Sequence, residues 1–369
     1  GATGTIAREL YIFDADPRNT EDLLGKEDLV LDNNTFYLTA PFTSRYRVIK
    51  NCNTLLTALD NTESVSDSEK DAYRGFANTM KGFMLSQVLA LLGDNGVRID
   101  VADPDNLGGY VSQSEGYDQI LSLMDLGFDQ MSGASIIFNL SGGFDGFNTT
   151  ETFNQFNRAI AARIATQGSL YGRALGYVNQ SFLDLDGDLN TGPQHVFSTG
   201  PGDFLNPLFK PAGQSGDQII VHPRMISDAL PGDLRFNKFA LRVDPTSQDG
   251  LNGDYETALY ESALSPAGII RNEELMLIYA EASFQTGADM DAVTGINAVR
   301  NANNLDDYSG GTGDEALIDE ILFQRRYSLW YEGQHMFDLR RYNRLNADFL
   351  PIDRVGDDVF TQFPIPLSE

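Results

Sequence analysis

Cysteine and histidine are nearly absent from this chain, which has one cysteine and three histidines in 369 residues. The lone Cys52 excludes a disulfide within the chain and a metal site built from cysteine clusters, and we expect it to be buried and inert. His195, His222 and His335 do not stand at the spacing of zinc ligands. Nucleophile-elbow and phosphate-loop motifs are also missing, so the sequence marks out no catalytic residue, metal site or cofactor.

Positive charge is scarce, with 26 Lys and Arg against 53 Asp and Glu, a formal net charge of -27. Such a field repels phosphate backbones and therefore argues against nucleic acid as a partner. It also argues against heavily sulfated glycans. The two basic clusters, Arg325-Arg326 and Arg340-Arg341, fall inside predicted core helices. No apolar run reaches the roughly 18 residues that a membrane span requires.

The strongest helical pattern lies between residues 270 and 342. Apolar residues recur there at the spacing of one helix face in three segments: Leu275, Ile278, Tyr279 and Ala282; Ala292, Ile296 and Val299; Leu317, Ile321 and Leu329. Gly287 ends the first predicted helix and Gly333 the third, and residues 336–342 make a short fourth. Ala280 and Ala292 stand where the two helices of a tetratricopeptide hairpin approach each other, although an ordinary helical hairpin fits the pattern equally well.

Further helices are predicted at residues 43–60, 69–92, 115–132, 150–170 and 171–183. Together with 271–303 and 314–342 they make four helical pairs, so the predicted fold is mainly α. Residues 35–38 alternate weakly like a short strand. Residues 184–268 are dense in Gly, Pro, Asp and Asn, and short strands are predicted there at 195–197 and 219–221.

The helices of the C-terminal half resemble the signature of the SusD/RagB family, glycan-binding lipoproteins on the outer surface of Bacteroidetes. Three motifs carry the resemblance: Arg271, Glu274, Leu275, Leu277, Ala280, Glu281 and Ala282; Ala292, Ile296, Asn297, Val299 and Arg300; Ile321, Arg325, Arg326, Leu329, Glu332, Gly333, Asp338, Leu339 and Arg341. The terminal Pro364-Ile365-Pro366 and Glu369 fit the family's closing motif. Gln324, Ser328 and Gln334-His335 depart from it and remove charges from what we expect to be a structural ion-pair network.

The resemblance implies a single SusD-like domain over residues 1–369. Its helical scaffold would span about 43–183 and 270–342, and its irregular ligand-binding lobe about 1–42 and 184–269. The implied function is non-catalytic: capture of oligosaccharide or polysaccharide at the outer membrane's extracellular face and delivery to a SusC-like TonB-dependent transporter. The family's N-terminal lipid anchor follows a removed signal peptide, and we expect both to be absent from this chain, which starts at Gly1. The charge favours a neutral glycan of β-glucan or fructan type.

Sugar recognition combines aromatic faces with amide and carboxylate side chains. Trp330 lies on a predicted core helix, so the platform is expected among loop Phe and Tyr residues. The irregular lobe at residues 184–269 contains three further candidates for sugar contacts: Phe204, Asn206 and Asp254. The predicted glycan contacts are Asn33, Asn34, Phe36, Tyr37, Phe209, Asn252, Tyr255 and Tyr260.

Three other interpretations of the chain stay open at this point. The chain could be a peptide-binding RagB-like member of the same family, a glycoside hydrolase on a helical scaffold, or a tetratricopeptide protein of the cytoplasm. No two acids stand out as a glycosidase pair. Residues 184–190 alternate Asp with other residues like the start of a calcium loop, but His195 occupies the twelfth position, and an acidic turn fits as well.

Overall fold

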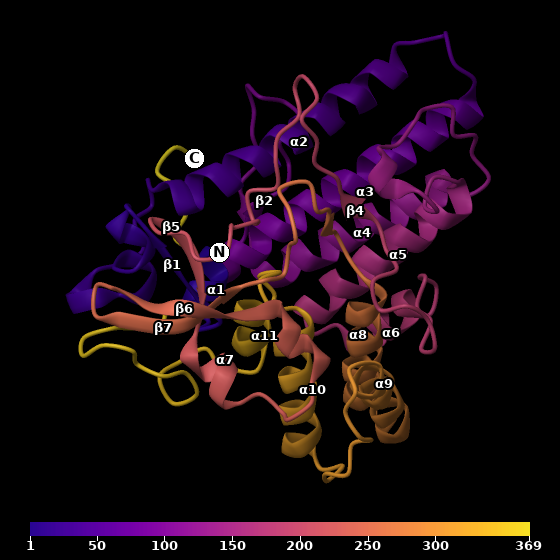
Figure 1. Ribbon diagram of the computed structural model, residues 1–369. Coiled ribbons are helices and arrows are strands. Elements are labelled where there is room, and N and C mark those ends of the chain that lie inside the picture. Colours follow the sequence, from indigo (N-terminus) through magenta and orange to yellow (C-terminus); the bar gives the residue numbers. More distant parts are fainter. The chain divides into compact units, whose positions relative to one another are not determined.

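The computed structural model describes residues 1–369, with the exception of the side chain of Asp314 (Figure 1). The chain forms two compact units. We call the first the mixed unit; it contains Gly1–Asp32, Asp188–Asn190 and Gln194–Thr361. The second, the helical unit, contains Asn33–Gly187, Thr191–Pro193 and Gln362–Glu369. No helix in the described part of the chain is long and apolar enough to cross a membrane.

The helical unit is a run of antiparallel helices. They are α2 (Phe36–Asp60), α3 (Asp67–Leu92), α4 (Gln113–Met131), α5 (Thr150–Gln167) and α6 (Tyr171–Val178), and each packs against the next. The two-residue strands β2 (Val97–Arg98) and β3 (Tyr110–Val111) pair between α3 and α4. Capping boxes at Ser66 and Thr149 satisfy the first free N–H groups of α3 and α5, which explains where these helices start.

Small residues allow α3 and α4 to approach closely. A Cβ atom on Gly75 would lie 2.8 Å from the backbone nitrogen of Met131 and 2.9 Å from the carbonyl oxygen of Gly127. Gly127 faces α3 in the same way, since its Cβ would lie 2.7 Å from Thr79 Oγ1. This is the close crossing expected of a tetratricopeptide-like pair.

We expect Gly75→Ala to lower the free energy of unfolding by about 1–3 kcal/mol, because backbone atoms on α4 would have to move. Gly176→Ala is the matched control. It also lies within a helix, no heavy atom stands within 4 Å of its Cβ position, and it should raise stability by about 0.5–1 kcal/mol. Urea titration followed by circular dichroism measures both changes. Equal effects at the two positions would contradict the close crossing.

The mixed unit combines a sheet with the C-terminal helices. Strands β1 (Leu10–Asp14), β5 (Asp217–Val221), β7 (Leu251–Thr257) and β6 (Phe239–Gln248) form an antiparallel sheet in that order. The shorter β4 (Gln194–His195) pairs with β8 (Ala267–Gly268). Its helices are α1 (Ala2–Ile6), α7 (Pro223–Ser227), α8 (Asn272–Gln285), α9 (Asp289–Ala302), α10 (Asp314–Ser328) and α11 (His335–Arg341).

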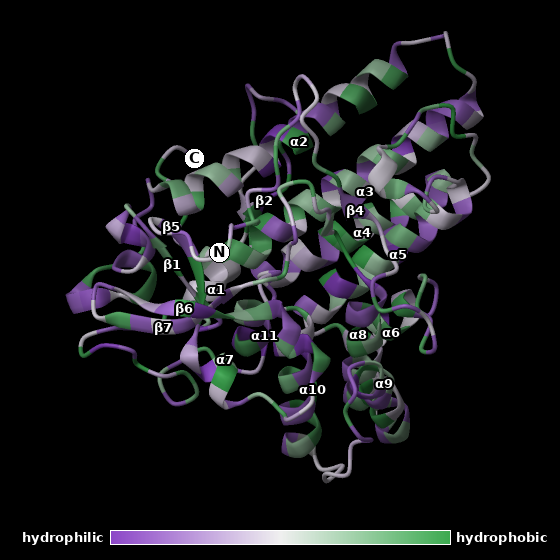
Figure 2. Ribbon diagram, in the orientation of Figure 1, coloured by the Kyte–Doolittle hydropathy of each residue, from purple (hydrophilic) through white to green (hydrophobic). Residues whose placement is uncertain are grey.

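Trp330 is the centre of the core of the mixed unit. It is fully buried, its ring meets Phe239 edge-on at 4.9 Å, and its Nε1 donates to the carbonyl oxygen of Glu9 at 3.1 Å. Leu10 and Val221, paired across β1 and β5, belong to the same cluster. The expectation that Trp330 is structural is confirmed. The helices carry both hydrophobic and hydrophilic residues, as the amphipathic patterns predicted (Figure 2).

The four predicted helical pairs are confirmed as α2–α3, α4–α5, α8–α9 and α10–α11. The first two pairs belong to the helical unit and the last two to the mixed unit. Ala280 and Ala292 are buried in one cluster, and a Cβ on Gly295 would lie 3.0 Å from that of Ala280. The predicted single domain over 1–369 stays a prediction.

One local prediction is wrong: residues 35–38 do not form a strand. They are the start of α2, which begins at Phe36 and contains Pro41. Leu38, Phe42 and Ile49 are all buried, at the spacing of a helix face. Burial of this face determines the conformation where the short aromatic run alone was ambiguous. Strand β5 confirms the strand at 219–221, and β4 covers the start of the one predicted at 195–197.

Candidate functional site

Three aromatic rings gather on an exposed loop of the mixed unit. His195 ends β4, and Phe197 and Phe204 follow it. The ring centroids of His195 lie 4.7 Å from Phe197 and 5.8 Å from Phe204, and those of Phe197 and Phe204 are 5.8 Å apart. Phe204 is 57% exposed, and its neighbour Leu205 is 49% exposed. We call His195, Phe197 and Phe204 the aromatic cluster. It presents ring surface to solvent, which is unusual for phenylalanine in a folded chain.

Polar groups border the aromatic cluster. The Asp203 carboxylate accepts the backbone N–H of Phe204 at 2.9 Å, and hydrogen bonds from Ser198 and that N–H hold the pKa of Asp203 below its usual value. Asn206 is buried and anchors the loop, because its Nδ2 donates to the Ser265 carbonyl oxygen at 2.8 Å. An anchored loop with an ionised carboxylate beside open rings can both stack on a ligand and accept hydrogen bonds from it.

A hollow of about 850 Å³ lies along α2 in the helical unit. Phe42, Tyr46 and Leu107 are among its apolar walls, and Asn53 and Thr57 are among its polar ones. The Tyr46 hydroxyl donates to the Arg98 carbonyl oxygen at 2.8 Å. We call it the α2 hollow; its mixture of aromatic, hydroxyl and amide groups suits a polyhydroxylated ligand.

Four of the predicted site residues belong to the helical unit. Asn33 and Asn34 form the turn before α2, and Phe36 and Tyr37 are its first two residues. The ring of Phe36 is 42% exposed, whereas that of Tyr37 is 6% exposed and lies 6.2 Å from Phe363. Of the two aromatic residues in this set, Phe36 is the more exposed.

The other four predicted residues belong to the mixed unit. Asn252 is exposed on β7. Phe209 is partly buried, and Tyr255 and Tyr260 pack against the core cluster around Trp330. Burial raises the pKa of Tyr260 to about 12. Among the described residues, none of these four makes a ring contact with the aromatic cluster.

Sequence reasoning missed His195 and Phe197. Phe204 was named as part of the irregular lobe, but the apolar piece 195–197 was interpreted only as a strand. The sequence did contain a signal for exposure. His195 and Phe197 stand in a segment rich in Gly and Pro, which offers few large side chains to bury their rings.

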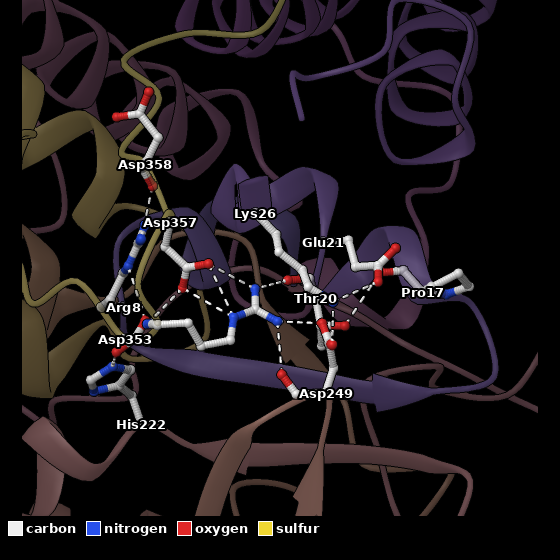
Figure 3. A network of polar contacts seen from close by, with 11 residues as sticks. Arg8, Pro17, Thr20, Glu21, Lys26, His222, Asp249, Asp353, Asp357 and Asp358 are labelled. Atoms are coloured by element: carbon white, nitrogen blue, oxygen red, sulfur yellow. Dashed lines mark hydrogen bonds and ion pairs between the residues drawn. The ribbon is translucent and has the colours of Figure 1, made fainter. Parts of the chain in front are cut away.

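His222 belongs to a network of charged groups in the mixed unit (Figure 3). A histidine beside a carboxylate is a candidate acid–base group. His222 Nε2 lies 2.9 Å from Asp353 Oδ1, and its Nδ1 accepts the backbone N–H of Arg224 at 3.1 Å. Both ring nitrogens are therefore engaged, and burial holds the pKa of His222 below its usual value. Arg8 Nε donates to Asp353 Oδ2 at 3.2 Å, and Arg354 joins Asp357 to the turn at Asp249. The network links segments that are far apart in the sequence. Because both nitrogens of His222 are hydrogen-bonded, this ring is not available to transfer a proton to or from a ligand.

The calcium interpretation of residues 184–190 finds no support in the geometry. Asp184 Oδ1 accepts the N–H of Asp186 at 3.1 Å, and Asp188 Oδ1 accepts that of Asn190 at 2.7 Å. These are side-chain turns. No group of three or more His, Cys, Asp or Glu residues in the described part of the chain could hold a metal ion.

The chain is similar to known proteins in sequence over part of its length and in fold over all of it. A model described as the SusD family matches residues 252–365. This match covers part of the C-terminal half, and the likeness to solved structures shows that the whole chain has the SusD fold. A SusD superfamily protein from Bacteroides vulgatus shares 17% identity at a TM-score of 0.73, over 100% of this chain and 91% of that one. No curated protein matches the chain.

Surface glycan-binding protein A from Bacteroides thetaiotaomicron shares 14% identity with this chain. Its TM-score is 0.77, over 100% of this chain and 90% of that one. The same protein in complex with laminarihexaose matches at a TM-score of 0.74 and 14% identity, over 100% of this chain and 91% of that one. At these identities the likeness shows the fold.

The SusD signature forms a buried ion network, as expected. Arg341 makes two hydrogen bonds to Glu281, at 2.9 and 2.8 Å, and its Nη1 donates to Asp338 Oδ1 at 3.0 Å. Arg325 Nε donates to the other Asp338 oxygen at 2.8 Å. Of the departures from the motif, Ser328 accepts a hydrogen bond from Arg235 at 3.0 Å. The Ser328 hydroxyl, a neutral acceptor, thus bonds an arginine at the position where the motif usually has an acid.

Proposed function

We propose that this protein binds a glycan at the cell surface without cleaving it. The exposed aromatic cluster is the observation that carries the proposal, because apolar ring faces stack on the CH face of a pyranose and Asp203 accepts hydrogen bonds from its hydroxyls. The names of the structural neighbours, one of them in complex with laminarihexaose, support the same conclusion.

The proposed ligand is a neutral glycan of β-glucan or fructan type. The formal charge of -27 disfavours a polyanion. The proposed partner is a SusC-like TonB-dependent transporter, to which the glycan is delivered. The proposed location is the extracellular face of the outer membrane, with attachment through an N-terminal lipid anchor. These three points rest on the family and on charge.

The predicted contacts remain part of the proposal: Asn33, Asn34, Phe36, Tyr37, Phe209, Asn252, Tyr255 and Tyr260. The exposed rings make the aromatic cluster the first place to test, and the α2 hollow the second. Phe36 is the predicted residue with the clearest open face.

We expect Phe204→Ala to weaken laminarihexaose binding by about 1 kcal/mol, roughly fivefold in Kd, since one stacking ring is lost. The combined variant with His195→Ala and Phe197→Ala should weaken it further. Isothermal titration calorimetry measures both, with a fructan oligosaccharide as a second ligand. Met290→Ala, which removes a 73% exposed side chain on α9, is the control and should leave Kd unchanged.

An unchanged Kd for the combined variant would move the site away from the cluster, and Tyr46→Ala and Phe36→Ala would then test the α2 hollow and the start of α2. Binding of a peptide pool with no glycan binding would favour the RagB-like alternative. New reducing ends after incubation with the bound glycan would favour the hydrolase.

A further inference from the structure

A second hollow, of about 410 Å³, lies within the mixed unit against α7, α10 and α11. Its charged and titratable lining consists of Arg224, Arg326, Arg344, Asp228, Asp319 and His335. We call it the arginine hollow. It differs from the rest of the chain in its charge, because three guanidinium groups meet two carboxylates there, whereas acids outnumber bases twofold overall.

Two of the arginines share one carboxylate. Arg224 Nε lies 3.1 Å from Asp228 Oδ2, and Arg326 Nη1 lies 2.8 Å from the same oxygen. Burial opposes ionisation of Asp228, but the hydrogen bond and charge of Arg326 outweigh it, so the pKa of Asp228 is below its usual value. Arg344 pairs with Asp319 at 2.5 Å, and the Asp319 side chain is 62% exposed. One positive charge in the hollow is therefore not neutralised.

Two side chains that border the hollow carry buried polar atoms without a partner in the described part of the chain, and these atoms have no surface open to the hollow. The side chain of Arg326 is 8% exposed, and its Nε and Nη2 have no hydrogen-bond partner among the described residues. His335 is 6% exposed, and its Nδ1 also has none. Burial lowers the pKa of His335 to about 3, so the ring is neutral and can offer either a donor or an acceptor. A ligand in the hollow can instead reach the guanidinium groups of Arg224 and Arg344, whose side chains are 38% and 17% exposed.

The remaining wall is apolar. Leu322 and Leu350 are 5% and 4% exposed, and Phe349 is 47% exposed. The Arg344 guanidinium lies 5.3 Å from the centre of the Phe349 ring, and Arg224 Nη1 donates to the Phe349 carbonyl oxygen at 2.6 Å. Apolar and cationic groups thus share one small space, which suits a ligand that has both an anionic and an apolar part.

We propose that the arginine hollow binds a carboxylate carried on a small apolar body. A carboxylate matches the planar fork of a guanidinium, and the partly exposed guanidinium groups of Arg224 and Arg344 can receive it. The apolar body would pack against Leu322, Phe349 and Leu350. Such a group can come from a free small acid or from the C-terminal end of a peptide chain. This site is separate in its residues from the aromatic cluster, and it does not depend on the proposed glycan.

Isothermal titration calorimetry with N-acetyl-leucine tests the proposal, with N-acetyl-leucinamide as the neutral match. The acid should bind, and the amide should bind at least tenfold more weakly. N-acetyl-glycyl-leucine distinguishes the two sources, since a site for chain ends should bind it more tightly than N-acetyl-leucine. Glucuronate carries the same charge on a polar body and should bind more weakly than N-acetyl-leucine.

The variants Arg224→Gln and Phe349→Ala should each weaken binding of the acid at least fivefold; both side chains are partly exposed, so the fold should tolerate the changes. Arg173→Gln is the matched control, because Arg173 is 36% exposed and paired with Asp118 at 3.1 Å in the helical unit. It should leave Kd unchanged. Equal affinity for acid and amide, equal loss in the control, or no binding of N-acetyl-leucine at millimolar concentration would each overturn the proposal.

Discussion

Replacing Arg341 with leucine is expected to lower the free energy of unfolding by about 3–5 kcal/mol, the usual cost of breaking a buried ion pair from one side. The Arg341 side chain is 1% exposed, and its loss removes the arginine that pairs with the fully buried Glu281 carboxylate, which keeps a hydrogen bond from the Tyr342 hydroxyl. It also removes one of the two arginines that bond Asp338. Urea titration followed by tryptophan fluorescence measures the change, since Trp330 lies in the same unit.

The neighbouring Arg340 is a matched control for this experiment. Its guanidinium lies 5.4 Å from the Phe337 ring and donates to the Thr361 carbonyl oxygen at 3.3 Å, in an exposed hydrogen bond. Arg340→Leu should therefore cost less than about 1 kcal/mol. A loss for Arg341→Leu no larger than that for Arg340→Leu would show that the buried network contributes little to stability.

Replacing Glu9 with glutamine is expected to raise the free energy of unfolding by about 4 kcal/mol at pH 8. Glu9 is fully buried, and both its carboxylate oxygens lack a partner among the described residues. Burial raises its pKa from an ordinary 4.5 to about 8, although the charge of Arg326 opposes the rise. The folded chain therefore keeps a proton that the unfolded chain loses.

The sign of the pH dependence follows from these two pKa values. Below pH 4.5 both states hold the proton, and Glu9 does not disfavour folding. Between pH 4.5 and 8 the unfolded state loses it first, so stability falls as pH rises. The gain from Glu9→Gln should thus be near zero at pH 4 and grow toward pH 8. The exposed Glu27→Gln is the control, and a gain independent of pH would contradict a protonated Glu9.

The helices of this fold could be predicted from the sequence because their apolar positions repeat at a fixed spacing. The sheet of the mixed unit could not. Leu10 pairs with Val221, and each short strand carries too few residues for its alternation to reveal its partner. The start of α2 was misread for a related reason, since Phe36 and Tyr37 favour a strand locally while burial of Leu38 and Phe42 favours a helix.

The candidate site was less predictable, because exposure is a property of the whole fold. Tyr255 and Phe204 are similar loop-region aromatics in sequence, yet Tyr255 packs 5.7 Å from Phe236 and Phe204 is mostly exposed. The arginine hollow was not foreseen either. Arg326 was assigned to the core, and only the fold brings Arg224 to the carboxylate that it shares with Arg326.

The contact between Arg8 and Asp353 has a consequence for the order of folding. These two residues are 345 positions apart, and Arg8 also donates to the Asp358 carbonyl oxygen. The ribosome must therefore synthesise almost the entire chain before Arg8 can bond to these acceptors. The helical unit has the same requirement, because Leu91 and Asn33 accept the backbone N–H groups of Phe363 and Leu367, which are among the last residues made. Strand β1, which follows Arg8, can pair with β5 earlier, but the ion pair of Arg8 forms only when the C-terminal segment has left the ribosome.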